Sequence, residues 1–429
     1  MNYQDTILYM YERLPMFSRI GEAAIKKDLV NTRLLCKALN DPQLHFPAIH
    51  VAGTNGKGSV SHMLASVMQS AGYKVGLYTS PHLKDFRERI RINGLPVSES
   101  FVTNFIDEQQ KNIEYIEPSF FELTVAMAFD AFAKEKVDLA IIETGLGGRL
   151  DSTNIIHPLV SVITNIGMDH MQLLGETLPE IAFEKAGIIK QDTPVVIGES
   201  GAETLPVFIK KAESCNARLI EASKEYEIVS VQQNESLDII LADRFGNRSS
   251  YKLDLIGLYQ QKNLITALTT LDILKELGWQ IPETATEKGF LEVQKQTGLQ
   301  GRWQVIQKEP TVLLDVAHNP DGIRQLTDQL KKNNYNKLHM IIGMVKDKDI
   351  STVLSLLPKD ALYYFTKAQI PRALDEKSLQ TQAQIHHLQG DCYQNVNEAL
   401  SAARKHASGD DLIIVCGSVF VVGEVNLTQ

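Results

Sequence analysis

Three glycines and one lysine lie close together in the stretch HVAGTNGKGSV, from His50 to Val60. Glycine lets the backbone turn sharply and brings its amide groups near an anion, and lysine adds a point charge. An apolar run precedes this stretch and a helical pattern follows it, so the positive end of the helix dipole would face the same anion. The arrangement favours nucleotide phosphate binding over a tight turn that uses glycine only for steric reasons.

The stretch departs from the common GxxxxGK[ST] pattern, because Lys57 precedes Gly58 rather than Ser59. It is therefore a variant phosphate loop. Ser59 could equally be a plain cap of the following helix, and the sequence leaves its role open.

A carboxylate and a histidine follow two later apolar runs. Glu143 lies at the end of VDLAIIET, before the glycine-rich GLGGRLDSTN, and Asp169 and His170 follow LVSVITNIG. Ligands of open α/β sheets bind at the carboxyl ends of the strands. As two adjacent strands, these runs would aim Glu143 and His170 at one point near the phosphates, where magnesium would bridge protein and nucleotide. A capping or core position for His170 fits the sequence equally well.

Other charged residues are more ambiguous. Lys185 follows Glu184 in EKAGIIK, and its spacing favours a surface or ion-paired lysine over a catalytic one. The segment TSPHLKDFRERIRING, residues 79–94, is too irregular and charged to be core. The arginines of this segment are Arg87, Arg89 and Arg91. They could bind an anionic substrate or belong to a solvated loop.

Short apolar runs rich in β-branched residues alternate with helical patterns, which predicts a parallel α/β sheet. The runs are AIHVAG from Ala48, KVGLYTS from Lys74, VDLAIIET from Val137, LVSVITNIG from Leu159 and TPVVIG from Thr193. Between the first two runs, apolar residues from Val60 to Ala71 recur at helical spacing and Gly72 supplies a stop signal.

The pattern becomes shorter and more polar between Glu221 and Leu255, which suggests a small antiparallel insertion. A second α/β series follows TGLQGRW, and we place the domain junction near residues 297–301. Strands of this second series are expected at Thr311–Val316, Leu338–Ile342, Ala361–Phe365 and Leu412–Cys416.

Composition narrows the class of protein. A chain of 429 residues predicts two or three folded units, and 43 Lys and Arg against 52 Asp and Glu give a net charge of −9. This charge argues against a general nucleic-acid or anionic-membrane surface and favours small-molecule partners. The four cysteines are Cys36, Cys215, Cys392 and Cys416. Because they form no CxxC pair, they suggest neither a disulfide framework nor a zinc site.

The amino terminus lacks the pattern of a secretion signal, and the longest apolar run, near Leu412 to Val422, is far shorter than the ~20 residues that span a bilayer. We therefore expect a cytoplasmic protein. We also expect the protein to be a monomer.

Seven motifs occur here in one order: HVAGTNGKGSV, YTSPHL with ERIRING, ETGLGGRLDSTN, GMDHMQLLG, FEKAGIIK, GRWQV and DVAHNP. Together they closely resemble the folylpolyglutamate synthase and dihydrofolate synthase family, within the Mur ligase superfamily. The resemblance runs from about Leu14 to Val422 and is weakest in the insertion and between Lys359 and Gln394. It implies a parallel-sheet ATP-binding domain over residues 1–297 and a smaller Rossmann-like glutamate ligase domain over residues 298–429.

The resemblance also implies roles for single residues. The phosphate loop would consist of Gly53, Thr54, Asn55, Gly56, Lys57, Gly58 and Ser59, with Lys57 neutralising charge during phosphoryl transfer. Ser80, Glu143 and His170 resemble magnesium ligands, and Lys185 matches a lysine that relatives carry as a carbamate, an anionic ligand for a second metal. Further ATP contacts would be Asn263, Arg302 and Asp315, and His318 would face ATP or glutamate.

The implied reaction is ATP-dependent amide formation. The γ-phosphate of ATP would pass to a carboxylate of dihydropteroate or a reduced folate, and the amine of L-glutamate would attack the acyl phosphate. Because an exposed acyl phosphate would hydrolyse, we expect domain closure to carry Arg302, Asp315 and His318 onto the nucleotide at Lys57. The pterin would lie near residues 120–124 and 149–153, where Asp151 and Ser152 occur.

Three alternatives remain. The chain could be a folylpolyglutamate synthase without the second activity. It could be another Mur-type amino-acid ligase, although the roughly 48 residues before the loop are too few for a UDP-sugar-binding domain. It could also be a nucleotide-controlled binding module, but Glu143, His170 and the DVAHNP turn would then have no reason to converge.

Overall fold

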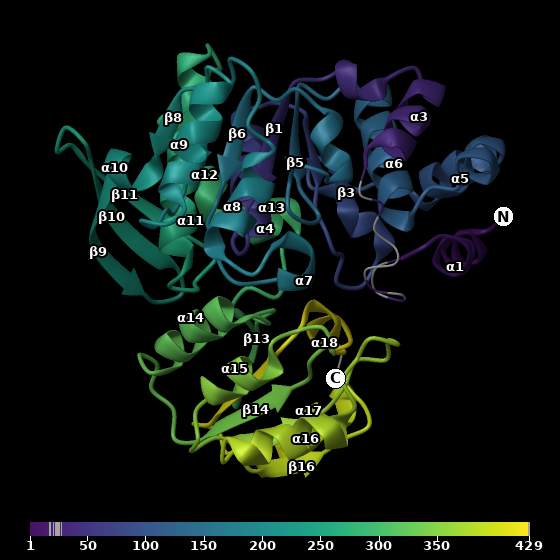
Figure 1. Ribbon diagram of the computed structural model, residues 1–429. Helices are drawn as coiled ribbons and strands as arrows, with labels where there is room; N and C mark the ends of the chain where they lie inside the picture. Colours follow the sequence, from purple (N-terminus) through teal and green to yellow (C-terminus); the bar gives the residue numbers. More distant parts are fainter. Residues whose placement is uncertain (17–18, 20, 22–25, 27, 428–429) are drawn as a thin grey trace. The chain divides into compact units, whose positions relative to one another are not determined.

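The computed structural model describes residues 1–16, 19, 21, 26 and 28–427 (Figure 1). The described chain divides into two units: residues 1–167 with 171–299, and residues 300–429 with 168–170. The sequence placed the boundary between residues 297 and 298 and gave no indication that Met168–His170 would group with the second unit.

The first unit is built on an eight-stranded sheet in the order β4-β3-β2-β5-β1-β6-β7-β8. All neighbouring pairs from β2 to β8 are parallel, and β3 and β4 add antiparallel strands at one edge. The predicted parallel α/β sheet is confirmed. The strands are β1 Ala48–Ala52, β2 Val75–Tyr78, β3 Ile90–Ile92, β4 Leu95–Pro96, β5 Leu139–Glu143, β6 Val160–Ile163, β7 Val195–Ile197 and β8 Leu219–Glu221.

Alternation along the strands gives this sheet two buried faces. Ile49 and Val51 of β1 pack into one apolar cluster, with residues of α4 and α11, whereas Ala48 packs into a second cluster with α6. Because successive side chains of a strand point to opposite faces, a run that is apolar at every position fits a sheet covered on both sides. The central strands are therefore enclosed by helices.

The helices of the first unit include those that cover the two faces of its sheet (Figure 1). The α-helices are α1 Tyr3–Arg13, α3 Val30–Ala38, α4 Lys57–Ser70, α5 Glu99–Ile116, α6 Phe120–Lys134, α7 Met171–Leu174, α8 Leu178–Ala186, α9 Leu205–Ser214, α10 Ala222–Glu225, α11 Gln260–Glu276, α12 Glu283–Leu291 and α13 Val293–Thr297. Short 3-10 helices are η2 Pro42–Leu44, η3 Phe86–Arg89 and η4 Ser152–Ile155.

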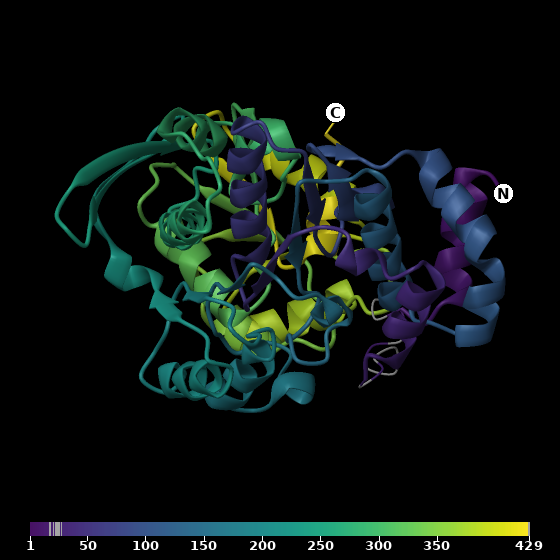
Figure 2. The same ribbon diagram turned by 90° about the horizontal axis from the view of Figure 1, so that it is seen from above.

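The polar segment after β8 forms the predicted antiparallel insertion. Its strands, in the order β11-β10-β9, are β9 Tyr226–Gln233, β10 Leu237–Asp243 and β11 Arg248–Leu253. Leu237, Ile239 and Leu241 alternate along β10 and are buried in the cluster that includes α11. The insertion lies at the opposite end of the first unit from α1 (Figures 1 and 2).

The second unit has a six-stranded sheet in the order β12-β13-β17-β14-β15-β16, parallel except for the pair β12 and β13. Its strands are β12 Gln304–Lys308, β13 Thr311–Leu314, β14 Leu338–Ile342, β15 Leu362–Phe365, β16 Gly390–Cys392 and β17 Leu412–Cys416. Its helices are α14 Pro320–Leu330, α15 Ile350–Ser355, α16 Glu376–Ile385, α17 Val396–His406 and α18 Val419–Gly423. The sequence identified four of these strands but missed β12 and β16, which are only partly buried.

One topological expectation was wrong. The runs that carry Glu143 and His170 at their ends are neighbours among the predicted strands of the chain, but β1 lies between β5 and β6 in the sheet. The two strands are therefore not adjacent. Of the helices in the described part of the chain, none has the length and apolar character needed to cross a membrane.

Candidate active site

The phosphate loop leaves β1 at Gly53, where only glycine fits. A Cβ on Gly53 would lie 1.9 Å from Oγ1 of Thr164, and a Cβ on Gly56 would lie 2.3 Å from Oδ1 of Asn263. Gly53 and Gly56 also have φ values of +150° and +84°, which disfavour larger residues. The glycines therefore allow the loop to pack closely against the end of β6 and the start of α11.

Hydrogen bonds fix the loop to the segment that follows β6. The amide of Asn55 donates to Oδ1 of Asn165 at 2.8 Å, and Oγ1 of Thr164 donates to the carbonyl oxygen of Asn55 at 2.6 Å. The amide of Gly167 donates to Oγ1 of Thr54 at 2.9 Å. These bonds hold the loop in one conformation, as a rigid anion site requires.

Lys57 is the first residue of α4 and folds back over the loop. Its Nζ donates to the carbonyl oxygens of Gly53 at 3.2 Å and Thr54 at 3.3 Å. The cation and the helix N-terminus thus lie at the same turn, which is the arrangement expected for phosphate binding.

Ser59 is not the cap of α4, because the cap position is occupied by Gly56. Its hydroxyl is buried and accepts a hydrogen bond from Nε2 of Gln260 at 3.2 Å. Oε1 of Gln260 in turn accepts from Nδ2 of Asn263 at 2.7 Å. The predicted site residue Asn263 is therefore connected to the loop through Gln260, a residue that the sequence gave no reason to select.

Two predicted metal ligands are brought together at the ends of β2 and β5. Glu143 is buried, and its Oε2 accepts a hydrogen bond from the amide of Ser80 at 3.1 Å. Carboxylate and hydroxyl oxygens are suitable ligands for magnesium, which usually takes only one or two carboxylates from the protein and further oxygens from phosphate and water. Ser80 and Glu143 thus fit part of a magnesium site.

Lys185 is buried, with 4% of the residue exposed, so of the two positions that its spacing favoured, surface or ion-paired, the surface position was wrong. Its Nζ donates to the carbonyl oxygen of Gly53 at 2.9 Å. The same oxygen accepts from Lys57, so two lysines contact the base of the phosphate loop. An unmodified ammonium group has no lone pair for a metal, so the lysine as it stands contributes positive charge.

The segment after β2 is more buried than the sequence indicated. Phe86, Arg89, Ile90 and Arg91 are all buried, and Ile90–Ile92 form strand β3. Arg87 differs, because it pairs with Asp85 at 2.9 Å and keeps partial exposure. A segment rich in arginine can therefore be buried in the folded protein when the protein provides a defined environment for each buried guanidinium group.

His170 lies in the second unit, next to a cluster centred on Asp169. Oδ2 of Asp169 accepts from Nδ2 of Asn319 at 3.1 Å and lies 3.4 Å from Nε2 of His318. Lys348 forms an ion pair with Oδ1 of Asp169, and its Nζ lies 3.3 Å from Nε2 of His170. The sequence gave no signal for Lys348.

Asp169 is ionised in this cluster. Burial alone would raise the pKa of its carboxyl, but the contact with His318 and the charge of Lys348 hold that pKa well below its usual range. The predicted site residues His170 and His318 therefore share one carboxylate as a neighbour.

Asp315 anchors the DVAHNP turn. Its two oxygens accept the amides of Trp303 and Ala317, each at 2.9 Å. Arg302 lies beside Trp303 and donates to the carbonyl oxygen of Gly301 at 3.3 Å. In this structure Asp315 joins the start of β12 to the end of β13, and ATP contacts by Asp315 and Arg302 remain predictions.

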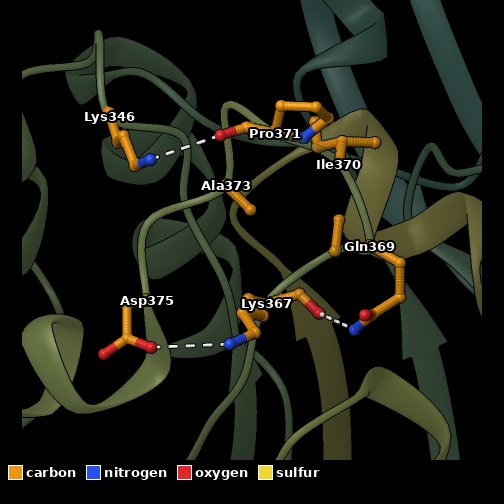
Figure 3. Close-up of a pocket in the computed structure, with 8 residues that line it drawn as sticks. Lys346, Lys367, Gln369, Ile370, Pro371, Ala373 and Asp375 are labelled. Carbon is orange, nitrogen blue, oxygen red and sulfur yellow. Dashed lines mark hydrogen bonds and ion pairs between the residues drawn. The ribbon is translucent and has the colours of Figure 1, made fainter. Parts of the chain in front are cut away.

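The second unit also contains a cavity of about 460 Å³ at the carboxyl ends of β14 and β15 (Figure 3). Nζ of Lys346 donates to the carbonyl oxygen of Pro371 at 3.2 Å, and Nζ of Lys367 lies 2.7 Å from Oε2 of Glu376. Both cations are thus satisfied by the protein. The lining residues are Lys346, Lys367, Ala368, Gln369, Ile370, Pro371, Ala373 and Asp375.

Among the residues that the structure describes, no three His, Cys, Asp or Glu side chains are grouped as a metal site. Of the four predicted metal residues, Ser80 and Glu143 contact each other, Lys185 contacts the phosphate loop and His170 lies in the second unit.

Comparisons with known proteins agree with this description. Residues 51–271 match the model of the Mur ligase middle domain, and residues 301–419 match that of the Mur ligase glutamate ligase domain. A phosphate loop in the first unit and a glutamate ligase domain in the second define the class: the chain is a Mur-type, ATP-dependent ligase that forms amide bonds.

Full-length relatives give the family. The dihydrofolate synthase/folylpolyglutamate synthase of Bacillus subtilis (strain 168) is 32% identical over 436 residues, covering 99% of this chain and 98% of the relative. The chain belongs to the dihydrofolate synthase/folylpolyglutamate synthase family.

Solved structures agree. E. coli FolC in complex with DHPP and ADP is 30% identical with a TM-score of 0.86, covering 99% of this chain and 96% of that one. The bifunctional enzyme of Yersinia pestis CO92, solved with AMPPNP and a Mn ion, is 28% identical with a TM-score of 0.84, covering 99% and 97%.

Proposed function

We propose that the chain is a bifunctional dihydrofolate synthase and folylpolyglutamate synthase. It would add L-glutamate to dihydropteroate and to the γ-carboxylate of tetrahydrofolate, with ATP as the source of energy. The observation that carries the proposal is the phosphate loop of the first unit, where Lys57 and Lys185 contact one carbonyl oxygen. Similarity to bifunctional relatives along nearly the whole chain supports the choice of substrates.

In the proposed first step, an oxygen of the substrate carboxylate forms a bond to the γ-phosphorus of ATP, and the bond from that phosphorus to the β-phosphate oxygen breaks. This releases ADP and leaves an acyl phosphate. Lys57 and the loop amides would stabilise the negative charge that develops on the transferred group. The hydrogen bond that Asn55 donates to Asn165 and the one that it accepts from Thr164 keep the loop in position for this step.

In the second step, the amine of L-glutamate forms a bond to the acyl carbon, and the bond from this carbon to the phosphate oxygen breaks. The amine loses a proton and inorganic phosphate leaves. His318 would face ATP or the incoming glutamate, and Asp169 would hold its ring in place through the contact at 3.4 Å. Arg302 and Asp315 would contact ATP, and closure of the two units would exclude water.

Ser80 and Glu143 would hold a magnesium ion, with His170 as a further ligand. The ion would supply positive charge to the phosphate oxygens. The relative from Yersinia pestis that was solved with AMPPNP and a Mn ion supports a divalent metal.

A second magnesium site would require a modified Lys185. Carbon dioxide adds to a neutral lysine amine, a nitrogen–carbon bond forms and a proton leaves, which gives an anionic carbamate. Burial of Lys185 beside the loop supports this proposal, because burial disfavours a charged ammonium group and carbon dioxide reacts with the neutral amine. A carbon-13 NMR signal from labelled bicarbonate that is lost in a Lys185→Arg variant would support the carbamate.

ADP release tests the function directly. It would be measured with dihydropteroate and with tetrahydrofolate, each with and without L-glutamate. We expect release with both pterins only when L-glutamate is present. Release with tetrahydrofolate alone as the acid substrate would reduce the assignment to a folylpolyglutamate synthase, and release with neither pterin would overturn it.

A further inference from the structure

Arg89 carries a buried charge that has no acidic partner. The residue is 8% exposed, and among the described residues no carboxylate forms an ion pair with it. Its Nε donates to Nδ1 of His82 at 2.8 Å, and its guanidinium lies 5.2 Å from the centre of the Phe120 ring. Burial lowers the pKa of Arg89. Since buried charges in proteins are normally paired, an anion from outside the chain would satisfy this one.

His82 orients the guanidinium but does not neutralise it. Because Nε of Arg89 can only donate, Nδ1 of His82 must accept, and the proton of the ring therefore lies on Nε2. That nitrogen is 3.3 Å from the hydroxyl of Tyr11. A ring with one accepting nitrogen and one proton is neutral, and His82 contacts only Nε of Arg89, not its terminal nitrogens.

A second polar group without a partner lies beside Arg89. Tyr78 is fully buried, and among the described residues its hydroxyl has no hydrogen bond of good geometry, although it lies within reach of the Arg89 side chain. It interacts electrostatically with Arg89, and its partner across the sheet is Ile90, the next residue in the chain. A tyrosine hydroxyl carries one proton that it can donate in a hydrogen bond.

Aromatic rings surround these two donors. The Phe120 ring lies 5.7 Å from the Phe86 ring, and the Phe121 ring lies 6.3 Å from the Tyr78 ring. A carboxylate is the planar anion that a guanidinium binds with two parallel hydrogen bonds, and apolar rings favour a ligand with a flat, apolar body next to that carboxylate. An aromatic carboxylic acid combines both features.

The location agrees with the site of the reaction. The amide of Thr79 donates to the carbonyl oxygen of Arg89 at 3.1 Å, and the next residue, Ser80, donates to Glu143. An anion at Arg89 would therefore lie close to the predicted metal ligands Ser80 and Glu143. Glu143 acts on Arg89 electrostatically.

We propose that Arg89 and Tyr78 bind a carboxylate of the acid substrate and thereby select an aromatic acid. This inference rests on the proposed function, since it assigns a receptor to the substrate of that reaction. Arg89 would donate through its terminal nitrogens and Tyr78 through its hydroxyl. Phe120 and Phe121 would contact the ring system of the substrate.

The test compares Arg89→Met with the wild-type chain. We expect the KM for dihydropteroate to rise about 10- to 100-fold, since a hydrogen-bonded charge pair is lost, whereas the KM for ATP stays within about twofold. The melting temperature should not fall, because the variant no longer buries an unpaired charge. Dihydropteroate should raise the melting temperature of the wild type but not of the variant.

Arg87→Met is the matched control, because Arg87 lies two residues away and pairs with Asp85. In Arg87→Met, the KM for dihydropteroate and the KM for ATP should both be unchanged. Tyr78→Phe should raise the KM for dihydropteroate by about 3- to 10-fold. If Arg89→Met does not fold, Tyr78→Phe and Arg89→Lys replace it in the same comparison of KM values, because each keeps most of the side-chain volume.

Two results would overturn the inference: a wild-type KM for dihydropteroate in Arg89→Met, or equal rises in both KM values with a lower melting temperature, which would indicate a structural role. Failure of the wild type to release ADP with either pterin would instead contradict the proposed function.

Discussion

The carboxyl edges of the two parallel sheets carry similar charged side chains, but these side chains are satisfied in different ways. At the edge of the second sheet, Asp315 accepts two backbone amides and Lys367 pairs with Glu376. At the edge of the first sheet, Arg89 has no acidic partner and the hydroxyl of Tyr78 has no hydrogen bond of good geometry. Both statements concern the described residues.

This difference teaches that a charged residue at the end of a strand is not by itself evidence for a ligand. The cavity of the second unit contains two lysines, yet both have partners within the protein. In the first unit, Arg89 and the hydroxyl of Tyr78 lie near Ser80 and Glu143 without such partners. A buried cation and a buried hydroxyl that lie together without partners mark a binding site better than charge or cavity size, because burying them costs free energy that a ligand can restore.

The largest expected effect concerns the buried pair of the second unit. Lys348→Met removes the lysine that pairs with the buried carboxylate of Asp169 and leaves it the contacts with Asn319 and His318, so we expect the free energy of unfolding to fall by about 3 kcal/mol. Urea unfolding measures this change. Lys331→Met is the control, because Lys331 and Asp328 form an exposed pair, and it should cost less than about 1 kcal/mol. If both variants lower the free energy of unfolding by the same amount, the buried charges of the second unit do not stabilise it more than an exposed ion pair does.

Next in size is the loss of the cation of the phosphate loop. Lys57→Ala should lower kcat for ADP release about 100- to 1000-fold, because the donor that stabilises the transferred phosphoryl group is absent. The melting temperature should change little. Lys74→Ala, which removes an exposed lysine paired with Glu135, should leave kcat unchanged. If kcat for ADP release falls less than tenfold in Lys57→Ala, the carboxyl edge of the first sheet does not have the proposed catalytic role.

A smaller effect is expected where the loop contacts α11. Gly56→Ala should lower the free energy of unfolding by about 1–2 kcal/mol, because φ is positive, and should also raise the KM for ATP, because the new Cβ displaces Asn263. Gly72→Ala separates the two causes. Gly72 has a φ of +95° but nothing within 4 Å, so only stability should change. The prediction fails if both variants have the same KM for ATP.

The smallest effect is expected in the cavity of the second unit. Lys346 is exposed and donates to a carbonyl oxygen, so Lys346→Met should change kcat and both KM values by less than about twofold and stability by less than about 1 kcal/mol. Steady-state kinetics with varied L-glutamate is the sharpest measurement. A selective rise in the KM for L-glutamate would break the comparison, because the cavity would then be a binding site.

The sequence predicted most of the fold for a clear physical reason. Strands β1, β2, β5, β6 and β7 are buried on both faces, so their apolar character is continuous and visible without alternation. Strands β12 and β16 are partly exposed, and their polar residues hid them. Strand order depends on contacts between distant segments, so the sequence could not show that β1 separates β5 from β6.

The site was predicted unevenly. The glycines and Lys57 were found because steric and charge requirements are local. Gln260 and Lys348 were missed because their role depends on side chains more than 150 residues away in the chain. Burial of Lys185 and Arg89 was missed because charge normally indicates exposure. Buried charges are therefore the least predictable part of this site.

The central position of β1 has a consequence for how the loop moves. Ile49 and Val51 are fully enclosed, and β1 has a parallel strand on each side. Amide protons from Ile49 to Ala52 should therefore be among the slowest in the chain to exchange with deuterium. A loop that starts from such a strand has already lost its conformational freedom when the chain folds. Nucleotide would then bind to a template that hardly rearranges, and any large displacement during turnover must arise elsewhere in the chain.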